Sequence, residues 1–287
     1  MITPFRKDES FLADVNSARQ DPDTVHIWWL GQSGFLVHRN QRFLLLDPYL
    51  SDSLTKKYAN TDKPHVRMTE RVVAPEALNF IGVVTSSHNH TDHLDAETLI
   101  PLRDVNPALQ LIVPEANRDF VAERLKTDAG WPLGCDDGTT LEFWGFTITG
   151  VPSAHETVER DDAGRCKYLG YVVRVGPWTL YHSGDTVLYE VMAEKLKPFG
   201  VDVALLPING AKPERRVAGN LSGRESAVLA KAIGAKLVVP CHYELFEFNT
   251  ATPDEFVEEA KRIGQPYRVL RAGERLDLRP DGSVGVG

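Results

Sequence analysis

Cysteine, clusters of basic residues and long apolar runs are all scarce in this chain of 287 residues. The three cysteines (Cys135, Cys166 and Cys241) lie far apart, which is typical of reduced thiols and not of a disulfide framework. No apolar run approaches the length of a membrane span, and the first residues carry no apolar signal core. We therefore expect a cytoplasmic protein with no membrane partner.

Basic charge is also limited. Lysine and arginine never occur in a run longer than two, and the formal net charge is −8. Proteins that bind nucleic acid normally present a basic face to the phosphates. The charge therefore argues against a nucleic-acid partner and favours a small-molecule substrate. The sequence is compatible with a homo-oligomer but does not define an oligomeric state.

The first part of the chain predicts one helix followed by three strands. Phe11, Leu12 and Val15 stand at helical spacing, which indicates a short amphipathic helix that ends before Asp21-Pro22. This helix makes residues 1–23 an N-terminal helical extension of the domain. Apolar runs separated by turn residues then predict short strands at 26–30, 34–38 and 42–47. The polar stretch 48–70 has no clear periodicity, and we expect it to form a mobile loop over a site.

Strands and helices alternate in the rest of the chain, and both halves of the chain begin with several consecutive strands. Two sheets packed back to back, with helices on their outer faces, would bury both sets of strands. The pattern therefore favours an α/β (α+β) fold, a four-layer αββα sandwich formed by residues 1–287 as one domain. The expected later elements are strands at 109–113, 140–143, 146–151, 171–175, 178–182, 201–206 and 236–240, and helices at 96–102, 117–126, 223–233 and 253–263.

The stretch 87–94 concentrates metal-binding chemistry. His88, His90, Asp92 and His93 lie within six residues, directly after the apolar run 80–85. Histidine and aspartate are costly to bury unless they are paired or bound to a metal. Imidazole suits zinc, iron and other transition metals, and carboxylate adds affinity for hard ions. This spacing indicates a metal site at the end of a strand.

Three further candidate ligands follow predicted strands in the same way. His155 comes after 151–154, Asp185 after 181–184 and His242 after 238–241, each at a turn marked by glycine or proline. A single histidine in such a position is more often an ordinary hydrogen-bonding residue. All three together complete the cluster, and we expect them to point into a shared groove.

These motifs resemble the signature of the metallo-β-lactamase superfamily: His88-Asn89-His90-Thr91-Asp92-His93, then His155, Ser183-Gly184-Asp185 and His242. The segments 28–31, 180–185 and 235–242 further resemble the branch that contains L-ascorbate-6-phosphate lactonase. The resemblance covers residues 24–248. It implies the αββα sandwich and a site for one or two divalent ions, manganese or zinc.

The resemblance also implies a division of roles. His88, His90 and His155 would hold one ion, Asp92, His93 and His242 the other, and Asp185 would bridge them. A hydroxide formed on the ions would be the nucleophile, since a metal-bound water ionises near neutral pH. Asp92 and Asp185 are the expected catalytic residues, with Asp92 orienting the nucleophile and carrying a proton to the leaving group.

Two positions refine the expected chemistry. Members of the lactonase branch need not carry a histidine where His155 stands, so its presence favours a fuller metal site and weakens an exact transfer of substrate. Superfamily members with di-iron redox chemistry usually have glutamate where His90 stands, which favours hydrolysis here.

Residues that bind the substrate are harder to assign. The region 207–221 follows a strand without apolar periodicity, and its basic residues either bind a phosphate or carboxylate or form a solvated loop. Asp47 either caps a turn or orients a ligand histidine, Gly31–Gly34 reads as a turn, and His65 as a bystander. The candidate substrate-binding residues are Asn209, Lys212, Arg215, Arg216, Asn220 and Tyr243.

The expected function is a metal-dependent hydrolase that opens a small polar ester, in particular a lactone such as a sugar-acid phosphate lactone. Two alternatives stay open. One is hydrolysis of a phosphodiester or phospholipid, which related branches perform with the same metals. The other is a metal-binding protein without catalysis, although structural zinc sites are usually closed and rich in thiolate.

Overall fold

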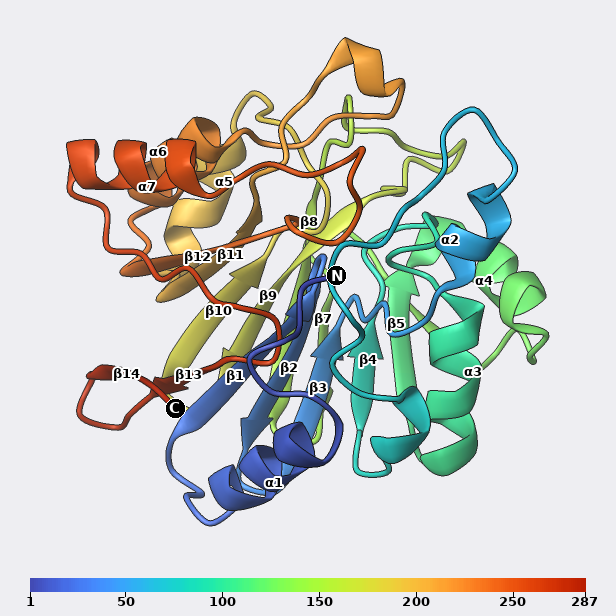
Figure 1. Cartoon of the computed structure of the whole chain (residues 1–287), viewed down its shortest axis with the longest axis horizontal. Helices are drawn as coiled ribbons and strands as arrows, with labels where there is room; N and C mark the ends of the chain where they lie inside the picture. Colours follow the sequence, from blue (N-terminus) through green and yellow to red (C-terminus); the bar gives the residue numbers. More distant parts are fainter.

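Two β-sheets form the centre of the molecule in the computed structural model, which describes the backbone of residues 1–287 and every side chain except that of Val286 (Figure 1). The larger sheet has the order β14-β13-β1-β2-β3-β4-β5-β6, formed by β14 (Val284–Val286), β13 (Arg275–Leu278), β1 (Val25–Gly31), β2 (Gly34–Arg39), β3 (Arg42–Leu46), β4 (Val83–Thr85), β5 (Gln110–Pro114) and β6 (Pro132–Cys135). The smaller sheet has the order β12-β11-β10-β9-β8-β7, formed by β12 (Leu237–Cys241), β11 (Val203–Pro207), β10 (Trp178–His182), β9 (Leu169–Val175), β8 (Phe146–Pro152) and β7 (Thr140–Phe143).

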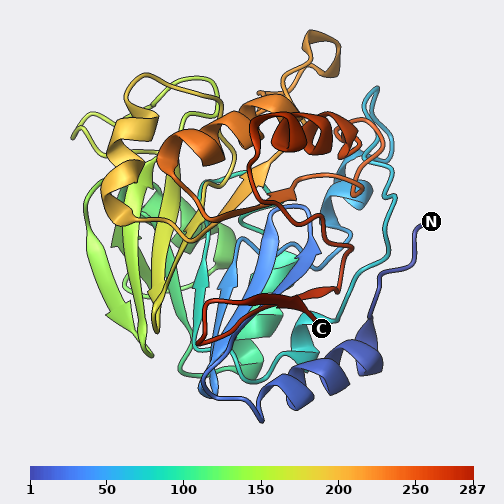
Figure 2. The ribbon, with the colours of Figure 1, turned by 90° about the vertical axis from the view of Figure 1, so that its left-hand side faces the viewer.

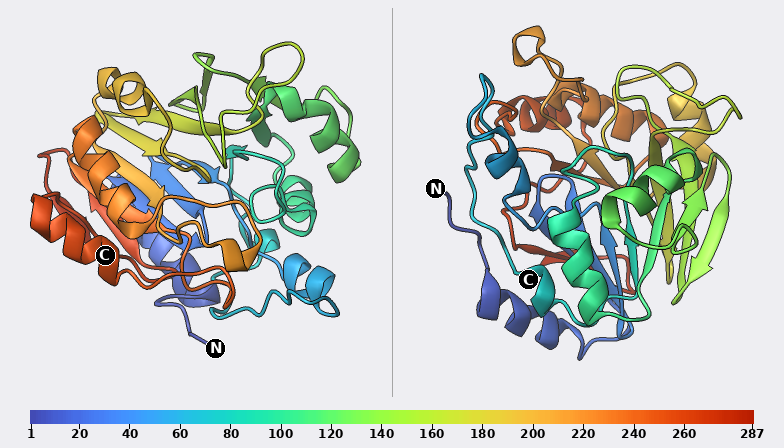
Figure 3. Two further views of the ribbon diagram at one scale, coloured as in Figure 1. Left: turned by 90° about the horizontal axis from the view of Figure 1, so that it is seen from above. Right: turned by 90° about the vertical axis from the view of Figure 1, so that its right-hand side faces the viewer.

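Helices cover the outer faces of both sheets. The helices are α1 (Asp8–Ala18), α2 (Ser53–Tyr58), α3 (Ala96–Val105), α4 (Arg118–Leu125), α5 (Met192–Leu196), α6 (Gly223–Ile233) and α7 (Asp254–Ile263). Helices α6 and α7 pack together at one end of the molecule and α1 lies at the other (Figure 2). Helices α3 and α4 lie side by side over the larger sheet (Figure 3). The αββα sandwich predicted from the sequence is confirmed.

The central strands of both sheets are buried and largely apolar. All residues of β4, β10, β11 and β12 are buried, which explains why these strands appear in the sequence as continuous apolar runs. Strand β4 runs parallel to β3 and β5, and β11 runs parallel to β10 and β12. Parallel strands end at the same edge of a sheet, so the loops that follow β4, β10 and β12 are brought toward one region.

The N-terminal helix is part of this packing. The Phe11 and Trp28 rings meet edge to face with centroids 6.3 Å apart, and the Trp28 indole Nε1 donates to Asp14 Oδ2 over 2.8 Å. Helix α1 is therefore fastened to β1. No helix among the described residues is both long and apolar enough to cross a bilayer.

Several elements differ from the sequence prediction. The stretch 48–70, expected to be loop, contains α2, and the chain also forms α5, β6, β13 and β14. These helices and strands have only three to six residues each. Elements this short leave little periodicity in a sequence, and the strands among them form by pairing with other strands. Strand β13, for example, pairs with β1 in an antiparallel register that places Leu276 opposite Ile27.

Candidate metal centre

Four loops meet at one edge of the sandwich, and each follows a buried strand. The loop after β4 carries His88, His90, Asp92 and His93, and the remaining candidate ligands follow β8, β10 and β12. Nitrogen and oxygen atoms from these loops form three overlapping groups in which every ligand atom lies within 4.8 Å of the others. The groups are His88-His90-His155, His88-His93-Asp185 and Asp92-His93-His242. The structure thus brings together all seven residues expected to bind metal.

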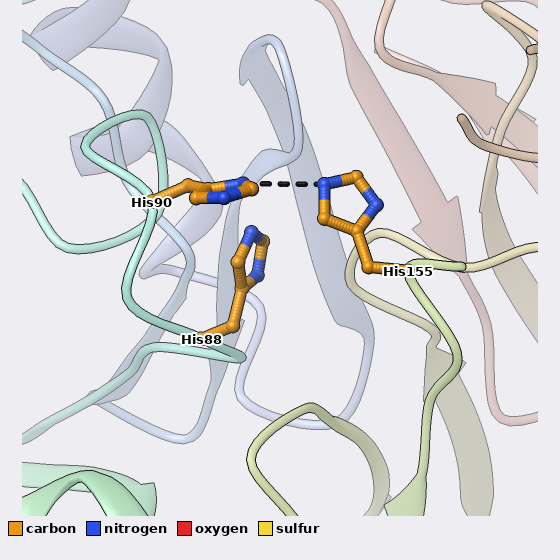
Figure 4. Close-up of side chains that lie close together, drawn as sticks. All are labelled: His88, His90 and His155. Atoms are coloured by element: carbon orange, nitrogen blue, oxygen red, sulfur yellow. Dashed lines mark hydrogen bonds between the residues drawn. The ribbon is translucent and has the colours of Figure 1, made fainter. Parts of the chain in front are cut away.

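The first group consists of three imidazoles that converge from two loops (Figure 4). His90 Nδ1 lies 3.2 Å from His155 Nε2. His155 Nδ1 donates to the Gly219 carbonyl over 3.1 Å, so its Nε2 carries the lone pair that faces His90. His88 Nε2 is buried and has no hydrogen-bond partner among the described side chains. Three lone pairs can therefore face one position.

Asp185 joins the first group to the group Asp92-His93-His242, called the second group from here on. His93 Nε2 lies 3.3 Å from Asp185 Oδ1, and His242 Nε2 lies 3.4 Å from Asp185 Oδ2. The same Oδ2 lies 3.9 Å from His155 Nε2, in the first group. Asp92 Oδ2 completes the second group at 3.7 Å from His93 Nε2 and 3.8 Å from His242 Nε2. Asp185 is therefore the carboxylate that can contact ions in both groups.

Asp47 contacts two of the histidines, His93 directly and His88 through the Ser87 hydroxyl. His93 Nδ1 donates to Asp47 Oδ2 over 2.6 Å, so Nε2 is the ring nitrogen of His93 that faces the site. The Ser87 hydroxyl also donates to Asp47 Oδ2, and His88 Nδ1 lies 3.0 Å from that hydroxyl. Hydrogen bonds of this kind orient metal-binding histidines and select their tautomer. Of the two roles that the sequence left open for Asp47, the structure supports the orientation of a ligand histidine.

The electrostatics of the cluster are those of a site built for cations. Burial lowers the pKa of His88 far below its ordinary value, and the neighbouring His93 lowers it further. Burial also opposes charge on His93 and Asp185, but their mutual attraction prevails: it holds the pKa of His93 well above its usual range and the pKa of Asp185 well below. Asp185 is thus an anion at neutral pH, and a cation that binds here must displace the proton of His93.

Gln32, which the sequence predicts to be a turn residue, is a member of the site. It is buried, and its Nε2 lies 2.7 Å from Asp92 Oδ2 and 2.9 Å from His242 Nε2. One amide nitrogen can donate to both atoms. A polar residue in the tight turn between two apolar strands, β1 and β2, is the signal that could have revealed it.

The backbone around the cluster adopts conformations that side chains usually avoid. Gln32, Asp47 and His242 have φ values of 50°, 40° and 63°. Gly184, which precedes Asp185, has φ 59°, and a Cβ there would come within 2.5 Å of Ser87 Cβ. Left-handed backbone at non-glycine residues is costly and gathers at functional sites. Here three such residues, Gln32, Asp47 and His242, stand in three different turns around the cluster.

The cluster forms the floor of a cavity of about 240 Å³. His90, Asp92, His155 and Asp185 line its base. The segment 54–65 forms one wall, as the sequence suggested for the stretch 48–70, but it includes His65, which was expected to be a bystander. The other lining residues are Leu54, Lys57, Tyr58, Asn89, Thr91, Arg124, Val217, Ala218, Phe246, Phe248 and Asn249.

Three of the predicted substrate-binding residues are tied into the protein near this cavity. Asn209 and Asn220 are buried and joined by a hydrogen bond of 3.1 Å. Arg215 is 8% exposed, and its guanidinium donates to the carbonyls of Asn209 and Thr250 over 2.6 and 2.5 Å. These bonds fasten the loop after β11 to the loop after β12.

The other three lie away from the cavity wall. Arg216 is exposed and pairs with Asp62 at 2.8 Å. Lys212 lines a separate surface pocket. Tyr243 is buried, its ring stacks on Trp29 at 4.3 Å between centroids, and its hydroxyl donates to the Leu270 carbonyl. The part of this region that reaches the metal cavity is Val217–Ala218.

The donor set fits divalent cations. Neutral imidazole and carboxylate are ligands for zinc, manganese, iron and nickel. The buried Nε2 atom of His88 has no hydrogen-bond partner among the described side chains, which is costly unless a cation takes its lone pair. His88, His90 and His155 would hold one ion and Asp92, His93 and His242 a second, with Asp185 between them.

Comparison with known proteins places this geometry in a family. The model of the Beta-lactamase superfamily domain matches residues 42–243. A UPF0173 metal-dependent hydrolase from Methanoregula boonei is 29% identical over 260 residues, covering 89% of this chain and 99% of the relative. Another from Methanosarcina mazei is 26% identical over 263 residues, covering 88% and 99%.

A solved structure shows the same fold. Igni18, a novel metallo hydrolase from Ignicoccus hospitalis, superposes with a TM-score of 0.63 at 22% identity, over 88% of this chain and 98% of that one. The family model matches well over half of the chain, and the strand-end histidines and aspartates all lie within its range. The chain therefore belongs to the metallo-β-lactamase superfamily.

Proposed function

We propose that this protein is a metal-dependent hydrolase that cleaves the ester bond of a small molecule, with lactones as the first substrates to test. The observation that carries the proposal is the convergence of seven ligand residues at the floor of an open cavity. The names of the relatives, metal-dependent hydrolases that match almost over their whole length, support it. We further propose manganese or zinc as the metal and the cytoplasm as the location.

Bound divalent ions would supply an acidified water as nucleophile and polarise the scissile carbonyl oxygen. The residues of the chain supply position and proton transfer. Asp185 contacts both ligand groups and balances their charge. Asp92 lines the cavity with its side chain 16% exposed, and Gln32 donates to its Oδ2. Asp92 is thus placed to accept a proton from a water in the cavity and to pass it to a leaving oxygen.

The proposal is tested by turnover of two matched panels with protein loaded with Mn²⁺ or Zn²⁺. The first panel contains lactones such as δ-valerolactone and γ-butyrolactone, and the second contains phosphodiesters such as bis(p-nitrophenyl) phosphate. We expect the lactone panel to be hydrolysed and Asp92→Asn to abolish turnover. Turnover of phosphodiesters alone would assign the site to that chemistry, and no turnover of either panel would favour a metal-binding protein without catalysis.

A further inference from the structure

The walls of the metal cavity differ from its floor. The floor is charged and polar, but the wall formed by the segment 54–65 and the loop after β12 is largely aromatic. Tyr58 and His65 stack with centroids 4.2 Å apart and ring planes 18° from parallel. His65 lies 4.4 Å from the Phe248 ring and 5.3 Å from the Phe246 ring. All four rings line the cavity.

These rings form a cluster separate from the main core. Phe246 packs with Tyr49, Leu54 and Leu245, and Tyr58 and Phe248 pack against that group while staying partly exposed. Burial lowers the pKa of His65, so its ring is uncharged at neutral pH and adds to the apolar surface. A partly exposed aromatic surface that faces a reactive site is typical of a ligand pocket, where apolar walls supply affinity and a few polar groups supply orientation.

Two basic residues line the cavity, Lys57 and Arg124, and the Lys57 ammonium lies 5.1 Å from the centroid of the Tyr58 ring. The loop after β11 reaches the cavity through Val217 and Ala218, and its arginines are engaged elsewhere, Arg215 with the carbonyls of Asn209 and Thr250 and Arg216 with Asp62. The Arg124 guanidinium donates to the carbonyls of Asn89 and Leu94. Of these basic groups, the Lys57 ammonium is the one left to meet an anionic substrate group, so the cavity offers less to a phosphorylated sugar than the resemblance to the lactonase branch implies.

We propose that the substrate carries an aromatic ring beside the scissile ester, and that Tyr58, His65, Phe246 and Phe248 form the subsite for this ring. The proposal rests on the proposed function for the ester, but the ring subsite can be tested without turnover. A flat ring can stack on or meet the edges of these side chains with contacts that a saturated group of similar size makes less well. His65 and Phe248, both partly exposed, are the specificity-determining residues.

The experiment is calorimetric binding of three carboxylates to the Mn²⁺-loaded protein: benzoate, cyclohexanecarboxylate and acetate. The carboxylate group is common to all three, so differences in Kd report the group attached to it. We expect benzoate to bind at least about tenfold more tightly than acetate and clearly more tightly than cyclohexanecarboxylate. Phe248→Ala and His65→Ala should each remove most of this preference, and Phe248→Tyr should keep it.

Trp144→Ala is the matched control, since Trp144 is a partly exposed aromatic residue that lines a different pocket. It should leave the preference unchanged. Equal binding of benzoate and cyclohexanecarboxylate, or a preference that survives the double variant His65→Ala/Phe248→Ala, would overturn the subsite. A benzoate preference in a protein that hydrolyses no ester would refute the proposed function while leaving the ring subsite in place.

Discussion

His93 and Asp47 form a fully buried pair in which His93 Nδ1 lies 2.6 Å from Asp47 Oδ2, while the opposite ring nitrogen of His93 faces Asp185 at 3.3 Å. The imidazole is therefore held between two carboxylates, one behind the site and one within it. This arrangement determines which nitrogen can bind an ion. It also links the end of β3, where Asp47 stands, to the ligand loop after β4.

Asp47→Asn should lower metal affinity by about 10- to 100-fold, because the amide no longer selects the tautomer of His93 with a free Nε2. Affinity is measured by competition with a chromophoric chelator. The chain offers a matched control in a second buried pair far from the site, where His26 Nδ1 lies 2.7 Å from Asp277 Oδ1. Asp277→Asn should alter stability but not metal affinity. Equal losses of affinity in both variants would mean that the effect is general destabilisation.

Gln32→Leu should weaken the ion held by Asp92 and His242 by about tenfold, since a hydrogen bond to a charged group contributes about 1.5–3 kcal/mol. The affinity of the three-histidine group should change little. A calorimetric titration with Zn²⁺ measures the binding of the two ions as two separate steps. A variant with both steps unchanged would show that the contact with Asp92 is incidental.

Arg215→Ala should lower the free energy of unfolding by about 2 kcal/mol, because it leaves buried acceptors at Asn209 and Thr250 without their donor. The adjacent Arg216→Ala serves as control. Its ion pair with Asp62 is exposed and screened by solvent, so stability should be nearly unchanged. Urea unfolding measures both. A larger effect at Arg216 would contradict the assignment of Arg215 as the loop anchor.

The buried His38 should lower the free energy of unfolding in acid. It is fully buried, and burial lowers its pKa from 6.5 to about 3. The unfolded chain therefore binds a proton at this residue between pH 6.5 and about 3 while the folded chain does not, so the stability contribution is present above pH 6.5 and is lost as the pH falls. The loss between pH 7 and pH 5 is at most about 2 kcal/mol.

His38→Gln removes this titration and keeps a side-chain oxygen that can accept from the Gln41 backbone N–H, which His38 Nε2 now does at 3.2 Å. Its unfolding free energy should fall less steeply between pH 7 and pH 5 than that of the native protein. Parallel curves for the two proteins would show that His38 does not contribute to acid unfolding.

The ligand set was predictable because each of its members follows a buried strand, and strand ends in such a sandwich share an edge. The supporting residues were less visible. Asp47 and Gln32 act through contacts with residues 46 and 60 positions away, His93 and Asp92, and their left-handed backbone leaves no mark in the sequence.

The residues that bind the substrate were less predictable from the sequence than the candidate metal ligands. The sequence places Arg215 and Arg216 side by side as candidate anion binders, but the chain turns one inward to bind carbonyls and the other outward to Asp62. The aromatic wall assembles from two segments about 180 residues apart, 58–65 and 246–248, and neither carries a periodic pattern. Only the fold reveals that they share one cavity.

Anomalous diffraction from crystals grown with Mn²⁺ or Zn²⁺ tests the two-ion site most directly. We predict two peaks about 3.5–4 Å apart, one among His88, His90 and His155 and the other among Asp92, His93 and His242, with Asp185 in contact with both. Asp185→Ala should lose at least one peak while the fold is kept. A single peak in the native protein at saturating metal, or peaks that do not contact these residues, would contradict the account.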